Sequence, residues 1–242
     1  MANLLVRKAL RSIGLLESAR TLKRRFRPAD RVFAPCTPHL LIAVNKGLRW
    51  CSERGLAEGS DYLEFGVYRG FTFWYTQALA ADMGIRDLRF FGFDSFFGLP
   101  RIEGPDTGGE FQEGAYTCAR RDVEMFLTTY GVDWDKTHLV EGWYDETLTR
   151  ATRQRYQLRR CSLCVIDCDL YSSARLVLEF LEPLVGEACV ILFDDWTSFE
   201  NQEMRGEQKA FTEFLHVNPK FTAEPFIEFG GHGKGFIVRR SV

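Results

Sequence analysis

The sequence predicts an α/β protein with a doubly wound, mostly parallel sheet of seven strands that includes a C-terminal antiparallel hairpin. Short apolar segments alternate with segments of helical spacing from residue 61 to residue 193, which is typical of parallel strands joined by crossover helices. Residues 161–166 and 188–193 are mostly apolar and predict central strands covered on both faces. The last two strands are separated only by residues 230–234, too few for a crossover, so we expect them to pair antiparallel.

The elements follow in chain order from periodicity and from Gly and Pro punctuation. A first helix is expected over residues 40–50, and a loop at 55–60 leads to the first strand within residues 61–67. Further helices are expected over residues 72–83, 122–130, 145–158 and 172–185. Further strands are expected over residues 88–93, 137–141, 161–166, 188–193, 221–229 and 235–239. A chain of 242 residues suits one such domain, which we place at residues 40–242.

Two segments stand outside this alternation. Residues 1–39 form a basic extension with a loosely helical apolar stripe and without the cleavage site of a signal peptide. This helix could bind a membrane surface or an anion, or it could pack on a partner subunit of a homo-oligomer or on the mouth of the pocket, and we favour packing. Residues 101–121 are rich in Gly, Pro, Asp and Thr and show no clear period, so we interpret them as a lid over the substrate site.

Composition argues against several classes of protein. The formal net charge of −2 argues against a nucleic-acid-binding surface, and no apolar run approaches the ~20 residues of a membrane span. Seven cysteines, an odd number, in a chain without a secretory signal indicate a reducing, cytoplasmic compartment. Cys161 and Cys164 form a C-x-x-C pair, but no second pair follows at zinc-site spacing, so buried thiols are favoured over a metal or redox site.

The stretch from Asp61 to Thr72 predicts a ligand-binding turn between the first strand and its helix. Gly66 and Gly70 lack a Cβ atom and let the backbone approach a ligand closely. A dinucleotide fingerprint would need its first glycine where this chain has Glu64, so a pyrophosphate would meet a carboxylate there. The turn therefore suits a cationic or amino-bearing ligand better than the NAD of an oxidoreductase.

The end of the next strand predicts a second part of this pocket. Asp94 and Ser95 follow the aromatic strand at residues 88–93, before a turn at Gly98. An acid at the carboxyl end of the second strand of a doubly wound sheet lies where a ribose hydroxyl pair would bind. Asp94 is therefore a candidate ligand for the ribose of a nucleotide-like cofactor.

Four aspartates follow the two central strands, Asp167 and Asp169 after the first and Asp194 and Asp195 after the second. Because parallel strands finish on the same edge of a sheet, we expect these side chains to be neighbours. Carboxylates so close repel unless some bind protons or a cation balances them, and a hard divalent ion such as Mg²⁺ is the simplest balance. The alternative is that each acid caps the helix that follows it, which we consider less favoured for all four together.

Six motifs in order resemble the macrocin O-methyltransferase (TylF/MycF-like) family over residues 40–215. These are Glu64-x-Gly66-x-x-x-Gly70-x-Thr72, Phe93-Asp94-Ser95-Phe96-x-Gly98-Leu99-Pro100, Gly142-Trp143, Asp167-x-Asp169-Leu170-Tyr171-x-Ser173, Phe193-Asp194-Asp195 and Gly206-Glu207-x-x-Ala210-Phe211. The resemblance implies a Rossmann-like class I methyltransferase fold, S-adenosylmethionine as cofactor and metal-assisted methylation of a hydroxyl group. It further implies a sugar of a glycosylated natural product as the small-molecule acceptor.

The resemblance also implies roles for individual residues. The metal ligands would be Asp167, Asp194 and Asp195, and Asp167 or Asp169 would accept the proton of the substrate hydroxyl. The turn would bind the methionine end of the cofactor, Asp94 the ribose, and Trp143 would flank the adenine unless it is a packed aromatic. The full set of cofactor-binding candidates is Glu64, Gly66, Val67, Tyr68, Gly70, Thr72, Asp94, Ser95, Gly142, Trp143 and Asp167.

Three other functions remain open from the sequence. A metal-independent small-molecule methyltransferase would use the same fold and cofactor. A NAD-dependent oxidoreductase would want glycine at position 64 and a placed Tyr-x-x-x-Lys or His, and a catalytically inactive binding homologue would be expected to lose the acids that this chain keeps. The acceptor itself is not readable, because residues 1–39 and 101–121 match no pattern.

Overall fold

The computed structural model describes residues 38–199 and 204–241. The basic extension predicted at residues 1–39 lies outside the described part of the chain except for its last two residues, so its role stays a prediction. Within the described residues, no helix is both long enough and apolar enough to cross a membrane.

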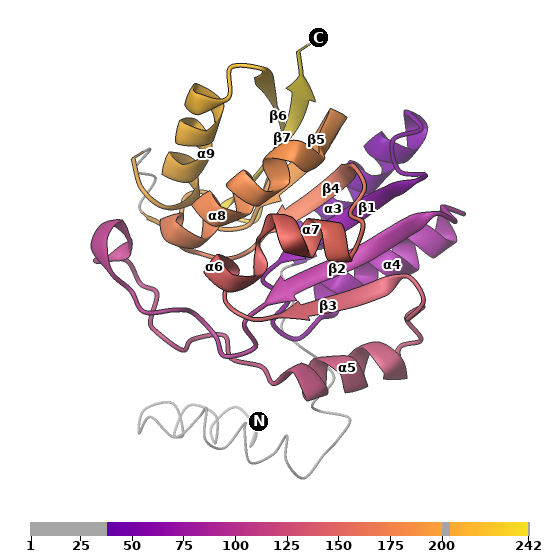
Figure 1. Cartoon of the computed structure of the whole chain (residues 1–242), viewed down its shortest axis with the longest axis horizontal. Coiled ribbons are helices and arrows are strands. Elements are labelled where there is room, and N and C mark those ends of the chain that lie inside the picture. The colour runs from indigo at the N-terminus through magenta and orange to yellow at the C-terminus, as the bar shows by residue number, and fades with distance from the viewer. Residues whose placement is uncertain (1–37, 200–203, 242) are drawn as a thin grey trace, which may run out of the picture. The chain divides into compact units, whose positions relative to one another are not determined.

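A seven-stranded sheet forms the centre of the protein, with strand order β3-β2-β1-β4-β5-β7-β6 (Figure 1). The first five strands in this order pair in parallel, and β7 pairs antiparallel with both β5 and β6. The short 230–234 connection predicted the antiparallel pairing of β6 with β7. The strands are β1 (Ser60–Phe65), β2 (Leu88–Asp94), β3 (Thr137–Glu141), β4 (Cys161–Ile166), β5 (Val185–Phe193), β6 (Phe221–Phe229) and β7 (Gly233–Arg240). This order is the class I fold that the sequence predicted, and its parallel strands end on one edge.

Helices cover both faces of the sheet. On one face, α3 (Pro38–Glu53) packs on α4 (Phe71–Asp82) and reaches the strands as far as β6. On the other face, which is toward the viewer in Figure 1, α8 (Tyr171–Leu181) packs between α6 (Tyr144–Thr147) and α9 (Gly206–Val217). The remaining helices are α5 (Arg120–Thr129) and α7 (Arg150–Arg155).

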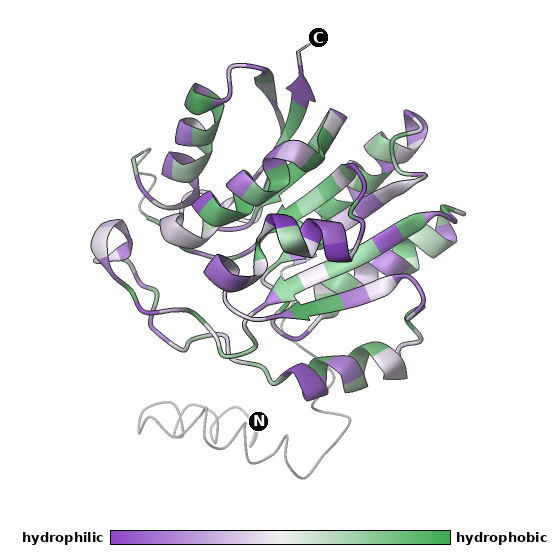
Figure 2. Ribbon diagram, in the orientation of Figure 1, coloured by the Kyte–Doolittle hydropathy of each residue, from purple (hydrophilic) through white to green (hydrophobic). Residues whose placement is uncertain are grey.

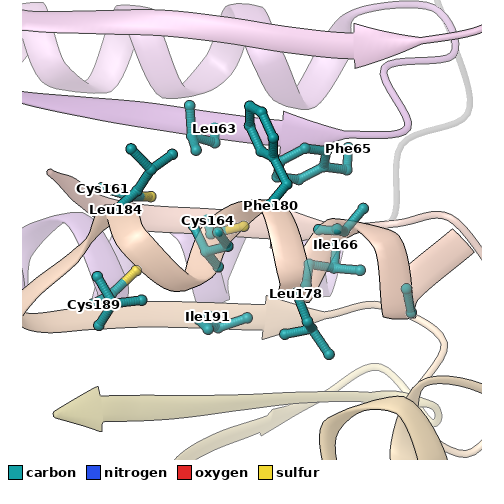
Figure 3. Close-up of a cluster of buried hydrophobic side chains, with 14 of the residues drawn as sticks. Leu63, Phe65, Cys161, Cys164, Ile166, Leu178, Phe180, Leu184, Cys189 and Ile191 are labelled. Carbon is teal, nitrogen blue, oxygen red and sulfur yellow. The ribbon is translucent and has the colours of Figure 1, made fainter. Parts of the chain in front are cut away.

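One hydrophobic core cluster lies between the sheet and α8. Phe65, Ile166 and Phe180 belong to it, and Figure 3 shows their side chains between the strands and this helix. Figure 2 shows the same division along the chain, with hydrophobic residues on the strands and hydrophilic residues on outward helix turns. Cys161 and Cys164 are fully buried, as the sequence predicted, and form no disulfide.

Two predicted helices differ from the structure. Residues 145–158 form two short helices, because Thr149 leaves the helical conformation and its hydroxyl accepts the N–H of Thr152 at 3.2 Å, which starts α7. The helix predicted over 172–185 ends at Leu181, a 3₁₀ turn with Pro183 follows, and β5 begins at Val185. Proline lacks the N–H that would continue an α-helix, so the chain joins the sheet earlier than periodicity suggested.

Candidate active site

The carboxyl edge of the parallel strands concentrates unusual backbone geometry. Four non-glycine residues near it adopt the left-handed conformation, with φ of 49° at Tyr68, 59° at Phe96, 60° at Tyr116 and 63° at Asp169. Each such residue costs roughly 1–3 kcal/mol and persists only where the surrounding structure holds it. Strained residues cluster at active sites, so these four residues indicate a functional site at this edge of the sheet.

Gly66 lies where the end of β1 packs closely against the end of β4. Its φ is 92°, and a Cβ atom on it would lie 1.8 Å from the carbonyl oxygen of Asp167. Its own N–H donates to the carbonyl of Phe93 at 3.0 Å, while the N–H of Asp167 donates to the carbonyl of Phe65 at 2.9 Å. Only glycine therefore fits at this position.

Gly70 begins the helix that follows this turn. It has φ of 79°, its N–H donates to the carbonyl of Val67 at 2.8 Å, and a Cβ atom on it would lie 3.0 Å from Val123. Thr72 lies in the first turn of α4, so the N-terminal end of this helix points out of the same turn. Free N–H groups at a helix N-terminus favour an anionic group.

Asp94 ties the two predicted cofactor loops together. Its Oδ2 atom accepts the N–H groups of Val67 at 2.8 Å and Tyr68 at 2.9 Å, and its Oδ1 atom accepts the N–H of Phe96 at 2.7 Å. Burial raises the pKa of Asp94, and these three hydrogen bonds act in the opposite direction. Ser95 shapes the same loop, because its hydroxyl donates to the carbonyl of Gly98 at 2.8 Å. The sequence did not indicate this loop-building role of the acid.

Glu64 is fully buried beneath the turn. It is 1% exposed, and its carboxylate accepts a hydrogen bond from the hydroxyl of Tyr62. Burial raises the pKa of Glu64 to about 8, the Tyr62 hydrogen bond lowers it, and the charge of Asp94 raises it further. Direct contact of Glu64 with the cofactor stays a prediction.

Gly142 and Trp143 follow β3 on the same edge. The N–H of Gly142 donates to the carbonyl of Asp94 at 3.1 Å, and Trp143 is the N-cap of α6. Trp143 is partly exposed, and no aromatic ring among the described residues packs against it. Its role, flanking the adenine or packing as an aromatic of the fold, stays a prediction.

The three predicted metal ligands lie together. One carboxylate oxygen from each of Asp167, Asp194 and Asp195 lies within 4.8 Å of the other two, and all three residues are partly exposed. Burial and then the charges of Asp194 and Asp195 raise the pKa of Asp167 well above its usual value. Burial and the charge of Asp195 raise the pKa of Asp194 to about 7. Clustered carboxylates repel one another in this way unless protons or a cation balance them.

Asp169 adjoins this group, as the sequence predicted. Burial, and then the charges of Asp195 and Asp194, raise the pKa of Asp169 well above its usual value. A carboxyl group with a raised pKa can hold a proton beside the three metal-ligand candidates.

Glu207 is a fifth acid that the sequence analysis left without a role. It is fully buried at the start of α9, and its Oε2 atom accepts the N–H of Asp195 at 3.1 Å. Its Oε1 atom is buried without a hydrogen-bond partner among the described residues. Burial and the charges of Asp195 and Asp167 raise its pKa. Its place in the Gly206-Glu207 motif was the signal that could have indicated it.

The acidic group fits a hard divalent cation. Three carboxylates converge, and the buried Glu207 behind them has an oxygen without a partner, which is an arrangement that proteins seldom leave uncompensated. Oxygen-only donors suit Mg²⁺ or Ca²⁺ and not a metal that prefers sulfur or imidazole.

The predicted lid, residues 101–121, is anchored at its beginning. Asp106 is 2% exposed, and its carboxylate accepts the N–H groups of Tyr171 at 2.7 Å and Ser172 at 3.2 Å at the start of α8. The guanidinium of Arg205 donates to the carbonyl of Thr107. The segment is thus attached to the helix that follows the Asp167–Asp169 loop.

Two solved structures share this fold. The O-methyltransferase NovP superposes with a TM-score of 0.67 at 18% identity, covering 84% of this chain and 79% of that one. The calicheamicin methyltransferase CalS11 superposes with a TM-score of 0.66 at 22% identity, covering 81% and 77%. At these identities the comparison shows the fold alone, which is that of class I methyltransferases.

Comparison of sequences identifies the family of the chain. The model of the macrocin-O-methyltransferase (TylF) family matches residues 44–221, and the chain belongs to this family. A tetracenomycin 4'-O-methyltransferase of Streptomyces olivaceus, named for a rhamnosyl acceptor, is 28% identical over 67% of this chain and 64% of its own length. The mycinamicin III 3''-O-methyltransferase of Micromonospora griseorubida is 26% identical over 67% of this chain and 66% of its own length. The alignments thus span just under two thirds of these relatives.

Proposed function

We propose that this protein is an S-adenosylmethionine-dependent O-methyltransferase that methylates a hydroxyl group on a sugar of a glycosylated natural product, assisted by Mg²⁺. The observation that carries the proposal is the convergence of Asp167, Asp194 and Asp195 on the edge that also bears the Gly66–Gly70 turn. Membership of the macrocin-O-methyltransferase family supports the reaction class.

The cofactor would lie along the Gly66–Gly70 turn. Gly66 lets the turn pack directly on the backbone of Asp167, and the N-terminal end of α4 would receive the carboxylate of the methionine moiety. Asp94, already bound by three N–H groups, has one lone pair left, on Oδ1, for a ribose hydroxyl. Trp143 would stack on the adenine. These assignments agree with the geometry and are open to test by calorimetry.

Asp167, Asp194 and Asp195 would hold the cation. A bound Mg²⁺ would supply Lewis acidity, lowering the pKa of the acceptor hydroxyl. The three carboxylates would place the cation, and with it the acceptor hydroxyl, near the methyl group, and Asp169 beside them would take up the proton. Glu207 holds the backbone of Asp195 and so keeps this carboxylate in place.

The acceptor class is inferred from the relatives. The names of the two curated relatives specify a rhamnosyl tetracenomycin and mycinamicin III as acceptors, and a third relative is named for demethyldecarbamoylnovobiocin. A panel of these three compounds with methyl-labelled S-adenosylmethionine tests the proposal by mass spectrometry. We expect label transfer to at least one of them, and loss of transfer after chelation with EDTA that added Mg²⁺ restores.

Three results would contradict parts of the proposal. Binding of NAD but not of S-adenosylmethionine in calorimetry would indicate the oxidoreductase alternative. Full activity in EDTA would indicate a metal-independent methyltransferase, and cofactor binding without transfer to any hydroxyl acceptor would indicate an inactive homologue. The homo-oligomer expected from the N-terminal extension is tested separately by light scattering of the full chain with and without residues 1–37.

A further inference from the structure

Two aromatic side chains lie exposed beside the candidate active site on paired segments of chain. Phe97 is 66% exposed and Tyr116 is 54% exposed. Their segments are joined by hydrogen bonds from the N–H of Gly114 to the carbonyl of Leu99 and from the N–H of Leu99 to the carbonyl of Ala115, both 2.9 Å. The hydroxyl of Thr117 donates to the carbonyl of Phe97 at 2.9 Å. The end of the 101–121 segment is thus bound to the loop that follows β2.

The backbone there is tightly held. A Cβ atom on Gly98 would lie 2.4 Å from the carbonyl oxygen of Ala115, so the two segments approach closer than other residues would allow. Tyr116 itself has φ of 60°, a conformation that a bulky residue adopts only when its surroundings impose it. A strained aromatic residue on a fixed loop at an active-site edge points to a functional position.

Tyr116 lies between the cofactor turn and the acidic group. Its ring meets the ring of Tyr68 edge-on, with centroids 6.0 Å apart and an interplanar angle of 85°. Burial, and then the charges of Asp169, Asp195 and Asp167, raise the pKa of Tyr116 to about 12. The phenol therefore remains protonated and can donate a hydrogen bond at neutral pH.

The exposed rings of Phe97 and Tyr116 favour one kind of acceptor. Exposed aromatic rings favour contact with an apolar body and with the C–H face of a sugar ring, and a diphosphate offers no apolar body.

We propose that Tyr116 and Phe97 form the acceptor platform, with the sugar ring on Tyr116 and an apolar aglycone against Phe97. This rests on the proposed function and deepens it. The acceptor is then a completed, uncharged glycoside and not a nucleotide-activated sugar. Transfer of the sugar to its aglycone must consequently precede methylation.

The test uses the full-length protein with mycinamicin III, the rhamnosyl tetracenomycin and demethyldecarbamoylnovobiocin, and with TDP-rhamnose as the charged comparison. We expect Tyr116→Ala and Phe97→Ala each to raise KM for the glycoside about tenfold while the Kd for S-adenosylmethionine stays unchanged. Tyr116→Phe keeps the ring and should retain most of the affinity. Trp134→Ala removes another exposed aromatic, before β3 at the opposite edge of the sheet, and should leave KM unchanged.

The outcomes separate the platform from the wider function. Methyl transfer with an unchanged KM in both alanine variants, at unchanged melting temperature, would overturn the platform and leave the methyltransferase proposal standing. A higher kcat/KM for TDP-rhamnose than for every glycoside would overturn the acceptor assignment. Cofactor binding without transfer to any of the four compounds would overturn the platform together with the proposed acceptor class.

Discussion

The carbonyl oxygen of Asp167 occupies the space that a Cβ atom at Gly66 would need, because the two would lie 1.8 Å apart. The cofactor turn after β1 and the first metal-ligand candidate after β4 are thereby fixed against each other. Any side chain at position 66 must displace one of these segments.

We expect Gly66→Ala to abolish binding of S-adenosylmethionine in calorimetry and to lower the free energy of unfolding. A contact of this kind forces backbone movement, and the positive φ adds a penalty of about 1 kcal/mol or more. Gly55→Ala is the matched control, because Gly55 also has a positive φ, of 66°, but no atom within 4 Å of its Cβ position. If both variants lose the same stability and Gly66→Ala still binds cofactor, the steric argument is wrong.

Asp194→Asn should separate stability from activity. Removing one charge from a repelling group should raise the melting temperature of the metal-free protein, while methyl transfer falls at least about 100-fold, since even residues behind metal ligands are worth 10–100-fold. The stabilisation that Mg²⁺ gives the wild type in thermal denaturation should disappear. Asp145→Asn, an exposed aspartate in α6, serves as control and should change neither property. A metal-free variant less stable than the wild type would contradict this reasoning.

Stability without divalent ions should fall as pH rises from about 5 to about 8. Glu64 has its pKa raised from 4.5 to about 8 and Asp194 from 3.8 to about 7, so the folded state holds protons that the unfolded state has released. The stabilising effect is complete below the unfolded pKa values and is lost as pH rises through the folded ones.

Glu64→Gln should flatten this slope, measured by urea denaturation in EDTA. The amide cannot titrate, and it keeps an oxygen that can accept from Tyr62. Glu187→Gln, an exposed residue of β5, should keep the slope of the wild type. An identical slope in the Glu64 variant would mean that this carboxyl is already ionised in the fold.

Asp106→Ala should lower the free energy of unfolding by about 1 kcal/mol, the usual effect of removing a side chain that caps a helix. It should also make residues 101–121 more sensitive to limited proteolysis, because the anchor on α8 is lost. Asp106→Asn retains an acceptor oxygen and should lose less. Asp135→Ala, exposed before β3, controls for loss of a surface charge. Unchanged protease sensitivity would show that Arg205 and the later contacts hold the segment alone.

The sequence by itself determined the alternation of strands and helices, the antiparallel end and the convergence of Asp167, Asp194 and Asp195. These follow from local periodicity and from one geometric rule, that parallel strands end on a common edge. Three strands match their predicted ranges because each is bounded by turn residues nearby in the chain. They are Cys161–Ile166, Thr137–Glu141 and Phe221–Phe229.

Only the tertiary structure decided which backbone groups each acidic side chain binds. Asp94 is bound by amides of the preceding loop, Asp106 caps a helix that begins 65 residues later, and Glu207 supports the backbone of Asp195. Tyr116 reaches the site through pairing with the loop after β2. Such contacts depend on how distant segments meet in space, and a side chain's hydrogen-bond partner is not encoded in the period of the residues around it.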